Sequence, residues 1–374
     1  GYPASNEKDL QYFQRVGDLD LKQTKISAFA MTRRKGLTAS GDESFEQVRR
    51  SSLGWITLVG KTSAFQATEV LRTTLEDNLA IVDDSIRHLV EHGQKVIFDA
   101  EHFFDGWFAD SEYTLRVLRA AAEAGAEMVV LCDTNGGRMP EEIAAATERV
   151  VAELPIPVGI HCHNDCGLAV ANTLAAVDAG ATQVQGTVNG FGERCGNADL
   201  ISVIANLQLK KQGYELLGGR GVEHLTELSR FVYEMANMNF RANQPFVGKS
   251  AFAHKGGMHV SGIARNTASY EHIDPARVGN ERRVLLSELS GRANIIALTQ
   301  RLNFEPDSAL MDKILAEVVS RENEGYQFEA ADGSFQLLVK KCVGTFKPHF
   351  ETLHYYVNVD NKSGGEVTAE AVVK

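Results

Sequence analysis

The sequence has few of the residues and patterns that mark disulfide-rich, disordered or membrane-spanning proteins. Its five cysteines, an odd number without a CxxC pair, argue against a disulfide framework and favour reduced thiols. Only 8 of its 374 residues are proline and 44% are hydrophobic, which excludes a disordered or fibrous chain. No apolar run approaches the roughly 18 to 20 residues that a membrane-spanning helix needs. We therefore expect a globular cytoplasmic protein.

Clusters of basic residues are also missing. The formal net charge is −11, and no run of five or more Lys and Arg residues occurs. This pattern argues against nucleic acid or an anionic membrane as the main partner, although it leaves room for a local basic pocket that binds an anionic cofactor. The chain is long enough for one large α/β domain with appendages, or for two ordinary domains.

What the sequence does contain is a regular alternation of β-type runs and amphipathic segments between residues 25 and 190. This alternation is typical of a parallel sheet built from βα units. After the second run, apolar residues recur at helical spacing from Leu71 to Leu89 and form one stripe that would pack on the sheet. Six strands are predicted, at residues 25–30, 55–60, 95–100, 128–133, 158–163 and 182–188.

Polar residues gather just after the predicted strands, as they do at the active-site rim of a TIM (β/α)8 barrel. Six βα units are too few to close such a barrel, and residues 1–20 resemble a loop and a helix whose strand is missing. We therefore expect a TIM barrel of which this chain lacks the first strand–helix unit and the second strand. A flavodoxin-like, doubly wound sheet is the alternative, because six strands would then be complete.

Three regions are predicted along the chain. Residues 1–212 form the catalytic TIM-barrel domain, incomplete at its amino terminus, and residues 213–344 form mainly helical subdomains that cover the active site. Residues 345–374 are expected to begin a C-terminal α+β regulatory domain, since residues 350–374 alternate like a hairpin. Beyond the sheet, helices are predicted at 197–211, 222–238, 283–301 and 308–321, and a glycine-rich loop at 243–262.

The segment VGIHCHND places two histidines where they can share a metal ion. Side chains alternate along a strand, so His161 and His163 point to one face and Cys162 to the other. The pair predicts a metal site, with two hydrogen-bonded structural histidines as an equal alternative. One βα unit later, Asn197 either offers a neutral amide oxygen or caps the next helix. Completed by a carboxylate, this donor set suits Mg²⁺, Mn²⁺ or Zn²⁺.

These residues and several further motifs carry a family resemblance. GIHCHND followed by GFGERCGN resembles the α-isopropylmalate synthase, homocitrate synthase and citramalate synthase family, with the HMG-CoA lyases as more distant relatives. Within that family, the motifs are similar to those of the long citramalate synthases, and they span essentially the whole chain: GYPASNEKD, DAEHFFDG, LCDTNGG, SAFAHKGGMHVSG, YEHIDP and LLSELSGRANI.

The resemblance implies a divalent-metal-dependent condensation of acetyl-CoA, the co-substrate, with a 2-oxo acid, which is pyruvate for citramalate synthases. It implies that His161, His163 and Asn197 are metal ligands. The aspartate ligand of the family and its neighbouring arginine belong to a TTLRDG-type motif that this chain does not contain, so activity of the chain by itself is in question. The product would enter isoleucine biosynthesis, and feedback inhibition by isoleucine is expected only of the longer parent protein.

The resemblance also implies catalytic and substrate-binding residues. Glu101 matches a carboxylate near the acyl group of acetyl-CoA, and Thr134 matches the threonine that holds the carboxylate of the 2-oxo acid. From the residues alone, Glu101 is more often a solvated or ion-paired rim glutamate, and Thr134 is equally well a helix cap. His259 and Tyr270 match a pair that assists proton transfer at the barrel of the partner chain, which implies a homodimer.

Three other functions stay open at this point. The same chemistry on another 2-oxo acid would make the chain a 2-isopropylmalate or homocitrate synthase. A metal-dependent carbon–carbon lyase is disfavoured by the additional HKGGMHVSG segment, since lyases of this superfamily are commonly little more than the barrel. A non-enzymatic binding protein that has lost its catalytic first strand is the third alternative.

Overall fold

The computed structural model divides into two compact units. Unit 1 comprises Gly1–Ala251 with Ala276–Asn280, and unit 2 comprises Phe252–Pro275 with the described residues from Glu281 onward. No helix in the described part of the chain is long and apolar enough to cross a membrane. The structure describes residues 1–285, 294–296, 299, 307–328 and 331–351.

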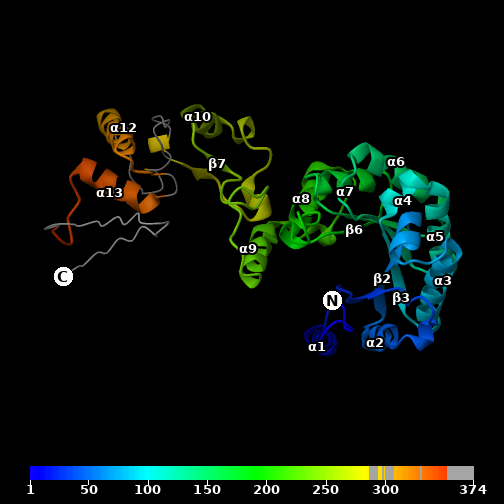
Figure 1. The fold of residues 1–374 in the computed structure, drawn as a ribbon. Helices are drawn as coiled ribbons and strands as arrows, with labels where there is room; N and C mark the ends of the chain where they lie inside the picture. The colour runs from blue at the N-terminus through cyan, green and yellow to red at the C-terminus, as the bar shows by residue number, and fades with distance from the viewer. Residues whose placement is uncertain (286–293, 297–298, 300–306, 329–330, 352–374) are drawn as a thin grey trace, which may run out of the picture. The chain divides into compact units, whose positions relative to one another are not determined.

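Unit 1 is built on a parallel six-stranded sheet with helices packed along its outer face (Figure 1). All six predicted strands are confirmed, with ends that differ by at most three residues. The alternation of apolar side chains explains them, because in β2 every second residue, such as Ile56 and Leu58, is fully buried. The strands are β1 (Ser27–Met31), β2 (Trp55–Lys61), β3 (Lys95–Glu101), β4 (Met128–Asp133), β5 (Val158–Cys162) and β6 (Gln183–Gln185).

The strands follow one another in the sheet in the order of the sequence. A doubly wound fold would reverse direction at a switch point, so the flavodoxin-like alternative is wrong. The sheet is also strongly curved. Gln185 of β6 donates a hydrogen bond of 2.7 Å to Asp99 of β3, although β4 and β5 lie between these strands, which a flat sheet would hold about 14 Å apart. Sequential order and curvature together are those of a TIM barrel.

Helix α3 (Leu75–Glu91) shows how the sequence fixes the helices. Its first turn is capped by Thr74, whose hydroxyl accepts a hydrogen bond from the amide of Asp77 at 3.0 Å. The predicted apolar stripe is confirmed, and its members from Val82 onward are fully buried. Leu71, at the beginning of that stripe, lies before the helix, because the preceding π-helical turn (Gln66–Val70) ends there.

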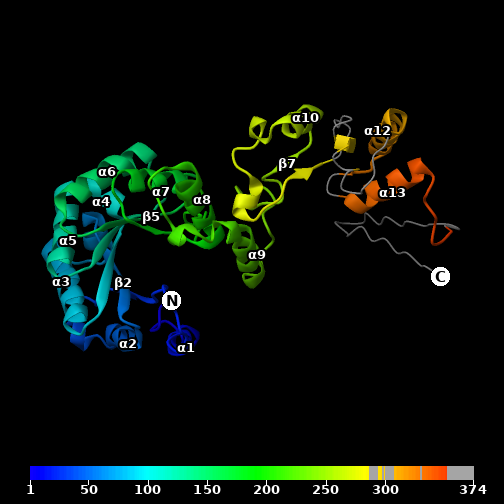
Figure 2. The same ribbon diagram turned by 180° about the vertical axis from the view of Figure 1, so that it is seen from behind.

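Helices α2 to α7 connect successive strands, α1 precedes β1, and α8 and α9 follow β6; the views in Figures 1 and 2 show α3 beside α5. In the predicted segment 197–211, the helix begins three residues late, and the side chain of Asp199 caps it. These helices are α1 (Glu7–Val16), α2 (Glu43–Ser51), α4 (Phe103–Ala109), α5 (Ser111–Glu123), α6 (Pro140–Glu153), α7 (Ala169–Asp178), α8 (Leu200–Lys210) and α9 (Leu225–Met235).

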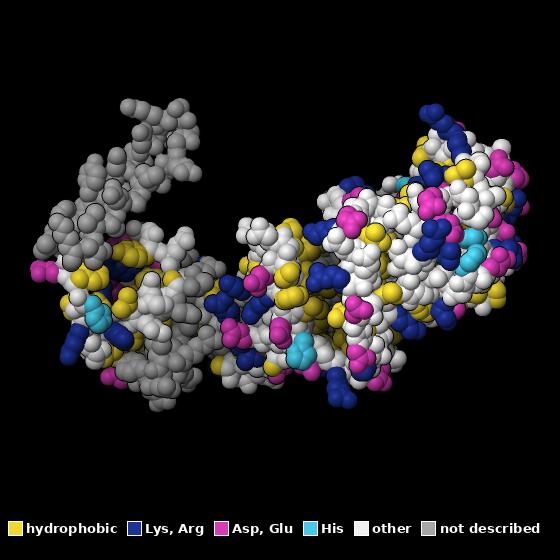
Figure 3. Space-filling model, turned by 90° about the horizontal axis from the view of Figure 1, so that it is seen from below, with side chains coloured by type: hydrophobic (Ala, Val, Ile, Leu, Met, Phe, Trp, Pro, Cys, Tyr) yellow, Lys and Arg dark blue, Asp and Glu magenta, His cyan; other side chains and the backbone are white. Residues whose placement is uncertain are grey.

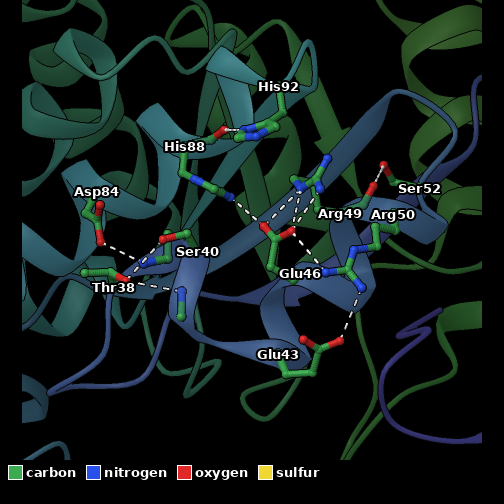
Figure 4. A network of polar contacts seen from close by, with 12 residues as sticks. Thr38, Ser40, Glu43, Glu46, Arg49, Arg50, Ser52, Asp84, His88 and His92 are labelled. Atoms are coloured by element: carbon green, nitrogen blue, oxygen red, sulfur yellow. Dashed lines mark hydrogen bonds and ion pairs between the residues drawn. The ribbon is translucent and has the colours of Figure 1, made fainter.

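A buried carboxylate joins α2 to α3 (Figure 4). Glu46 of α2 accepts hydrogen bonds of 2.8 to 3.1 Å from Arg49 and contacts Nε2 of His88 on α3. The hydrogen bond from Arg49 is the main cause that lowers the pKa of Glu46 to about 2. The hydrogen bond from His88 lowers it further, and burial acts in the opposite direction.

Elsewhere the surface is mixed in charge, and Figure 3 shows Lys and Arg interspersed with Asp and Glu.

Unit 2 is mainly helical. It contains a short parallel pair, β7 (Ala253–His254) and β8 (Arg283–Val284), and the amide of Arg283 donates to the carbonyl of Phe252, just before β7, at 2.9 Å. Buried Glu271 holds this region by pairing with Arg282 at 2.5 Å and with His254 at 3.2 Å. Its helices are α10 (Gly257–Arg265), α12 (Ser308–Asn323) and α13 (Asp332–Val343).

Two predictions for this part of the chain are wrong in detail. The loop predicted at 243–262 contains β7 and the first turns of α10, and the helix predicted at 283–301 begins with β8. The backbone of residues 283–284 instead pairs with β7, an interaction that a helical pattern in the sequence does not reveal. The helix predicted at 308–321 is confirmed by α12. The hairpin predicted at 350–374 lies almost entirely outside the described residues.

Candidate active site

The two histidines of the VGIHCHND segment lie side by side at the carboxyl end of β5. Nε2 of His161 is 3.3 Å from Nε2 of His163, and the ring centroids are 5.1 Å apart. Cys162, between them, is fully buried on the opposite face. The alternation predicted from the sequence therefore brings the two imidazoles together.

A hydrogen-bonded chain from β3 fixes the orientation of the first imidazole. Asp99 accepts a hydrogen bond of 2.7 Å from the amide nitrogen of Gln185, which leaves the amide oxygen of Gln185 to face His161. That oxygen lies 2.9 Å from Nδ1 of His161 and can only accept, so Nδ1 carries the proton. The lone pair of His161 is consequently on Nε2, the atom that faces His163.

Burial keeps both imidazoles neutral near neutral pH. It is the main cause that lowers the pKa of His161, and it also lowers the pKa of His163, with Arg194 as the next cause. Burial also raises the pKa of Asp99 to about 7, against the hydrogen bond from Gln185. Neutral imidazoles carry the lone pairs that a metal ion requires.

Asn197 is held beside His163 by a tight turn. Residues 163 and 197 form an isolated β-bridge, and the amide of Asn197 donates to the carbonyl of Gly190 at 3.1 Å. Gly196 makes the turn possible with a φ of +89°, and a Cβ there would lie 2.0 Å from the carbonyl oxygen of Gly190. Because Asp199 caps α8, the alternative role of Asn197 as the helix cap is wrong.

Two buried polar atoms in this group have no hydrogen-bond partner, namely Nδ1 of His163 and Oδ1 of Asn197. Buried polar atoms are ordinarily satisfied, so Oδ1 of Asn197 calls for a ligand, whereas Nδ1 of His163 is not the ring nitrogen that faces His161. Zn–N bonds of about 2.0–2.1 Å place two ligand nitrogens roughly 3.0–3.4 Å apart, which fits the Nε2 separation of the histidines. Within the described residues no group of three or more His, Cys, Asp or Glu side chains could hold a metal. The donors here are two imidazoles and one amide.

Thr134 lies at the end of β4, next to this group. Its hydroxyl oxygen accepts a hydrogen bond of 2.8 Å from the amide of His102, so its hydrogen is free to donate to an added ligand. The helix that follows is capped at Met139, which removes the alternative of Thr134 as a helix cap. Arg194 ties this loop to the next one, because it donates to the carbonyl of Thr134 at 2.8 Å and pairs with both oxygens of Asp165.

Glu101, the last residue of β3, forms an ion pair with Lys61, the last residue of β2. Both side chains are largely buried, with exposures of 26% and 14%. Of the two alternatives for a rim glutamate, solvated or ion-paired, the structure shows the ion-paired one. It shares one face of β3 with Asp99, two residues earlier.

His259 and Tyr270 are brought together within unit 2. Their rings stack with centroids 4.1 Å apart, and both side chains are exposed. The other predicted site residues, Glu101, Thr134, His161, His163 and Asn197, all belong to unit 1.

Sequence reasoning missed four residues of this site, Lys61, Asp99, Gln185 and Arg194. Strand alternation could have identified Asp99, because it lies two residues before Glu101 on the same face. Gln185 contacts Asp99 only because the sheet curves. Arg194 contacts Thr134 only because its turn reaches back to the preceding loops.

Comparison with known proteins places this geometry in a family. Residues 1–232 match the HMGL-like family, and residues 246–325 match the homocitrate synthase post-HMGL domain-like family. The (R)-citramalate synthase of Geobacter sulfurreducens is 46% identical over 364 residues, which cover 97% of this chain and 69% of that protein. The (R)-citramalate synthase of Aquifex aeolicus is 43% identical over 378 residues, which cover 100% of this chain and 71% of that protein.

A solved structure gives the same fold. The crystal structure of the HMG-CoA lyase from Brucella melitensis superposes with a TM-score of 0.50 at 18% identity and covers 62% of this chain and 80% of that one. At this identity the likeness concerns the fold alone. Identity to the two synthases extends through both units. The chain therefore belongs to the HMGL-like family, in its (R)-citramalate synthase branch.

Proposed function

We propose that this chain carries out a metal-dependent condensation of acetyl-CoA with pyruvate to give (R)-citramalate and CoA, in isoleucine biosynthesis. The observation that carries the proposal is the group formed by His161, His163 and Asn197, in which the two Nε2 atoms lie 3.3 Å apart and the buried Oδ1 of Asn197 lacks a partner. This group lies at the carboxyl edge of the sheet, where TIM-barrel enzymes have their active sites.

The 2-oxo acid binds beside the imidazoles. His161, His163 and Asn197 would hold Mg²⁺, Mn²⁺ or Zn²⁺, which acts as a Lewis acid on the carbonyl group of the oxo acid when bound. Thr134 donates its free hydroxyl hydrogen to the carboxylate of the oxo acid, since its oxygen is already engaged by the amide of His102. The chain Asp99–Gln185–His161 keeps the lone pair of His161 directed at the site.

The acetyl group binds near Glu101. A base among Glu101, His259 and Tyr270 takes a proton from the acetyl methyl group. The resulting carbanion forms a carbon–carbon bond to the carbonyl carbon of pyruvate, whose oxygen takes up a proton from one of the same groups. Hydrolysis of the thioester by water then releases CoA and a carboxylate, which makes the reaction effectively irreversible. Lys61 holds the carboxylate of Glu101 in place and supplies positive charge where enolate charge develops.

His259 and Tyr270 are proposed to assist proton transfer, from the partner chain of a homodimer. Their stacked, exposed rings present a donor and an acceptor together, as proton transfer to a bound ligand requires.

For the domains, we propose a catalytic barrel up to residue 212, subdomains over residues 213–344 and a regulatory domain from residue 345. The barrel would hold eight strands in its complete form, with the remaining carboxylate ligand on one of the two strands outside the six described here.

The test is release of free CoA thiol from acetyl-CoA in the presence of Mg²⁺ or Mn²⁺. Pyruvate, 2-oxoisovalerate and 2-oxoglutarate are compared, for this chain and for a form extended at the amino terminus by a strand carrying the aspartate and arginine. We expect the extended form to release CoA with pyruvate, and we expect the His163→Ala variant of that form to lose this release.

The outcomes separate the alternatives. A preference for 2-oxoisovalerate or 2-oxoglutarate would move the substrate assignment within the family. Absence of CoA release from the extended form with all three acids would overturn the synthase proposal. Cleavage of citramalyl-CoA without any condensation would identify a lyase instead.

A further inference from the structure

A histidine–aspartate pair lies in unit 1 where β3 passes into α4. Nδ1 of His102 is 3.0 Å from Oδ2 of Asp105. Both side chains are partly buried, with exposures of 14% and 31%. The pair follows the carboxyl end of β3, and TIM-barrel enzymes bind their substrates at this edge of the sheet. It is therefore placed where a reacting group could meet it.

The backbone of His102 lies between the two substrate subsites of the proposed reaction. His102 directly follows Glu101, near which the acetyl group is placed. Its amide donates a hydrogen bond of 2.8 Å to the hydroxyl oxygen of Thr134, the residue proposed to hold the oxo acid. Its φ of +59° is in the left-handed region, which is uncommon for residues other than glycine and is concentrated at functional sites.

Asp105 is held as a carboxylate by three donors. Besides His102, the amide nitrogen of Asn135 donates to Oδ2 at 2.6 Å, and Arg138 donates to Oδ1 at 3.2 Å. The hydrogen bond from His102 is the main cause that lowers the pKa of Asp105; the one from Arg138 lowers it further, and burial acts in the opposite direction. An ionised carboxylate can only accept hydrogen bonds, so Nδ1 of His102 carries a proton.

The other ring nitrogen of His102 is available to a ligand. Nε2 makes no hydrogen bond within the described part of the chain, and it is not one of the buried polar atoms there that lack a partner. Solvent therefore reaches this nitrogen. In the neutral imidazole Nε2 carries the lone pair, because Asp105 keeps the proton on Nδ1. An imidazole whose far nitrogen is oriented by a carboxylate is the arrangement of a general base in hydrolytic enzymes.

The proposed reaction needs such a base in its last step, because water is a poor nucleophile toward a thioester. The groups proposed for carbon–carbon bond formation are Glu101, His259 and Tyr270, and they leave the hydrolytic water without a base. We propose that His102 is the general base of thioester hydrolysis and that Asp105 is its positioning residue. This inference rests on the proposed function, because the thioester is the citramalyl-CoA that the condensation forms.

The hydrolytic step balances on one imidazole. Nε2 of His102 takes a proton from water while the water oxygen bonds to the thioester carbonyl carbon. The carbon–sulfur bond of the tetrahedral intermediate then breaks, and the CoA sulfur takes the proton from the imidazolium. The products are the free thiol of CoA and the carboxylic acid of citramalate, which ionises, and His102 returns to its neutral form.

The test supplies citramalyl-CoA to the extended form with Mn²⁺ and follows the release of free thiol. For His102→Ala we expect about a hundredfold lower kcat, the low end of what a general base contributes, with an unchanged KM. Added imidazole should restore part of the rate, which a merely structural role would not allow. Asp105→Asn should lower kcat about tenfold, because an amide no longer fixes the tautomer. With acetyl-CoA and pyruvate, His102→Ala should accumulate citramalyl-CoA, detected by mass spectrometry.

His224→Ala is the matched control. His224 also directly precedes a helix of unit 1, α9, and its Nδ1 lies 3.3 Å from Oε2 of Glu227, three residues later. Both of these side chains are exposed, at 68% and 81%, and neither belongs to the proposed site. This variant should release thiol from citramalyl-CoA at the wild-type rate.

Hydrolysis of supplied citramalyl-CoA does not depend on condensation, so the two proposals can fail separately. Thiol release that is lost in His102→Ala and kept in His224→Ala supports the inference even if no oxo acid is condensed, a result that would count against the proposed function alone. Equal thiol release by His102→Ala and the wild type would overturn the inference. Loss of both condensation and hydrolysis in His102→Ala, without recovery by imidazole, would show a structural role and overturn it as well.

Discussion

The network around Glu46 makes a quantitative prediction for stability. Lowering the pKa of this carboxyl from 4.5 to about 2 corresponds to about 3 kcal/mol of the free energy of unfolding. The side chain is only 9% exposed, so solvent screens the interaction little. Glu46→Gln should therefore destabilise unit 1 by about this amount at pH 7, since it also leaves Arg49 without its partner.

The dependence on pH follows from the sign of the change. The folded-state pKa lies below the ordinary value, so ionised Glu46 stabilises unit 1 above about pH 4.5, and this contribution is lost as the pH falls towards 2. The wild type and Glu46→Gln should differ most at neutral pH and converge in acid.

The measurement is urea unfolding followed by tryptophan fluorescence, which reports on unit 1 because Trp55 and Trp107, the two tryptophans of the chain, both lie there. Glu43→Gln is the control on the same helix, because its pair with Arg50 is exposed and should contribute less than about 0.5 kcal/mol. A Glu46→Gln effect that is equally large at pH 7 and pH 3 would refute this reasoning.

Three further predictions concern the site. Gln185→Leu should weaken Mn²⁺ binding, measured by calorimetry, about 10- to 100-fold, because it removes the acceptor that orients His161. Gln183→Leu, the same change two residues earlier on β6, should leave the affinity unchanged if that orientation is the cause. Gly196→Ala should abolish Mn²⁺ binding, since the added Cβ collides with a carbonyl oxygen, whereas Gly213→Ala meets no atom within 4 Å and should lower the melting temperature only slightly. Of the five free cysteines two are exposed, so we expect these two to react first with a thiol reagent at pH 8 and the two buried ones only after unfolding. Rapid reaction of all five in the folded protein would contradict the burial described here.

The strands and the imidazole pair were predictable because they depend on local patterns. Alternation along β5 is enough to direct His161 and His163 to one face, and apolar runs are enough to locate the strands. The role of Asn197 as a cap or as a ligand could not be decided from the sequence, because it depends on which nearby residue caps α8. The structure gives the cap to Asp199 and leaves the amide oxygen of Asn197 without a partner.

Contacts between distant strands were beyond the reach of sequence patterns. Asp99 and Gln185 are 86 positions apart, and they meet only because the sheet curves. The two-residue strand β8 is likewise too short to carry a periodicity, and its pairing with β7 displaces the helix that the composition favours. In unit 2, the two partners of Glu271, His254 and Arg282, come from separate segments of the chain, so sequence patterns could not predict these pairs either.

The sequential order of the strands in unit 1 separates the parts of the protein that can vary from those that cannot. Each strand delivers one loop to the same edge, while its buried residues, such as Ile56 and Leu58, belong only to the core. A loop can therefore be exchanged during evolution without repacking the scaffold, and the remaining loops keep their positions. An ancestral protein could in this way acquire a different oxo-acid pocket through changes in one loop while it kept its metal ligands and its CoA site. Substrate range and folding stability are, for this reason, open to selection almost independently of each other.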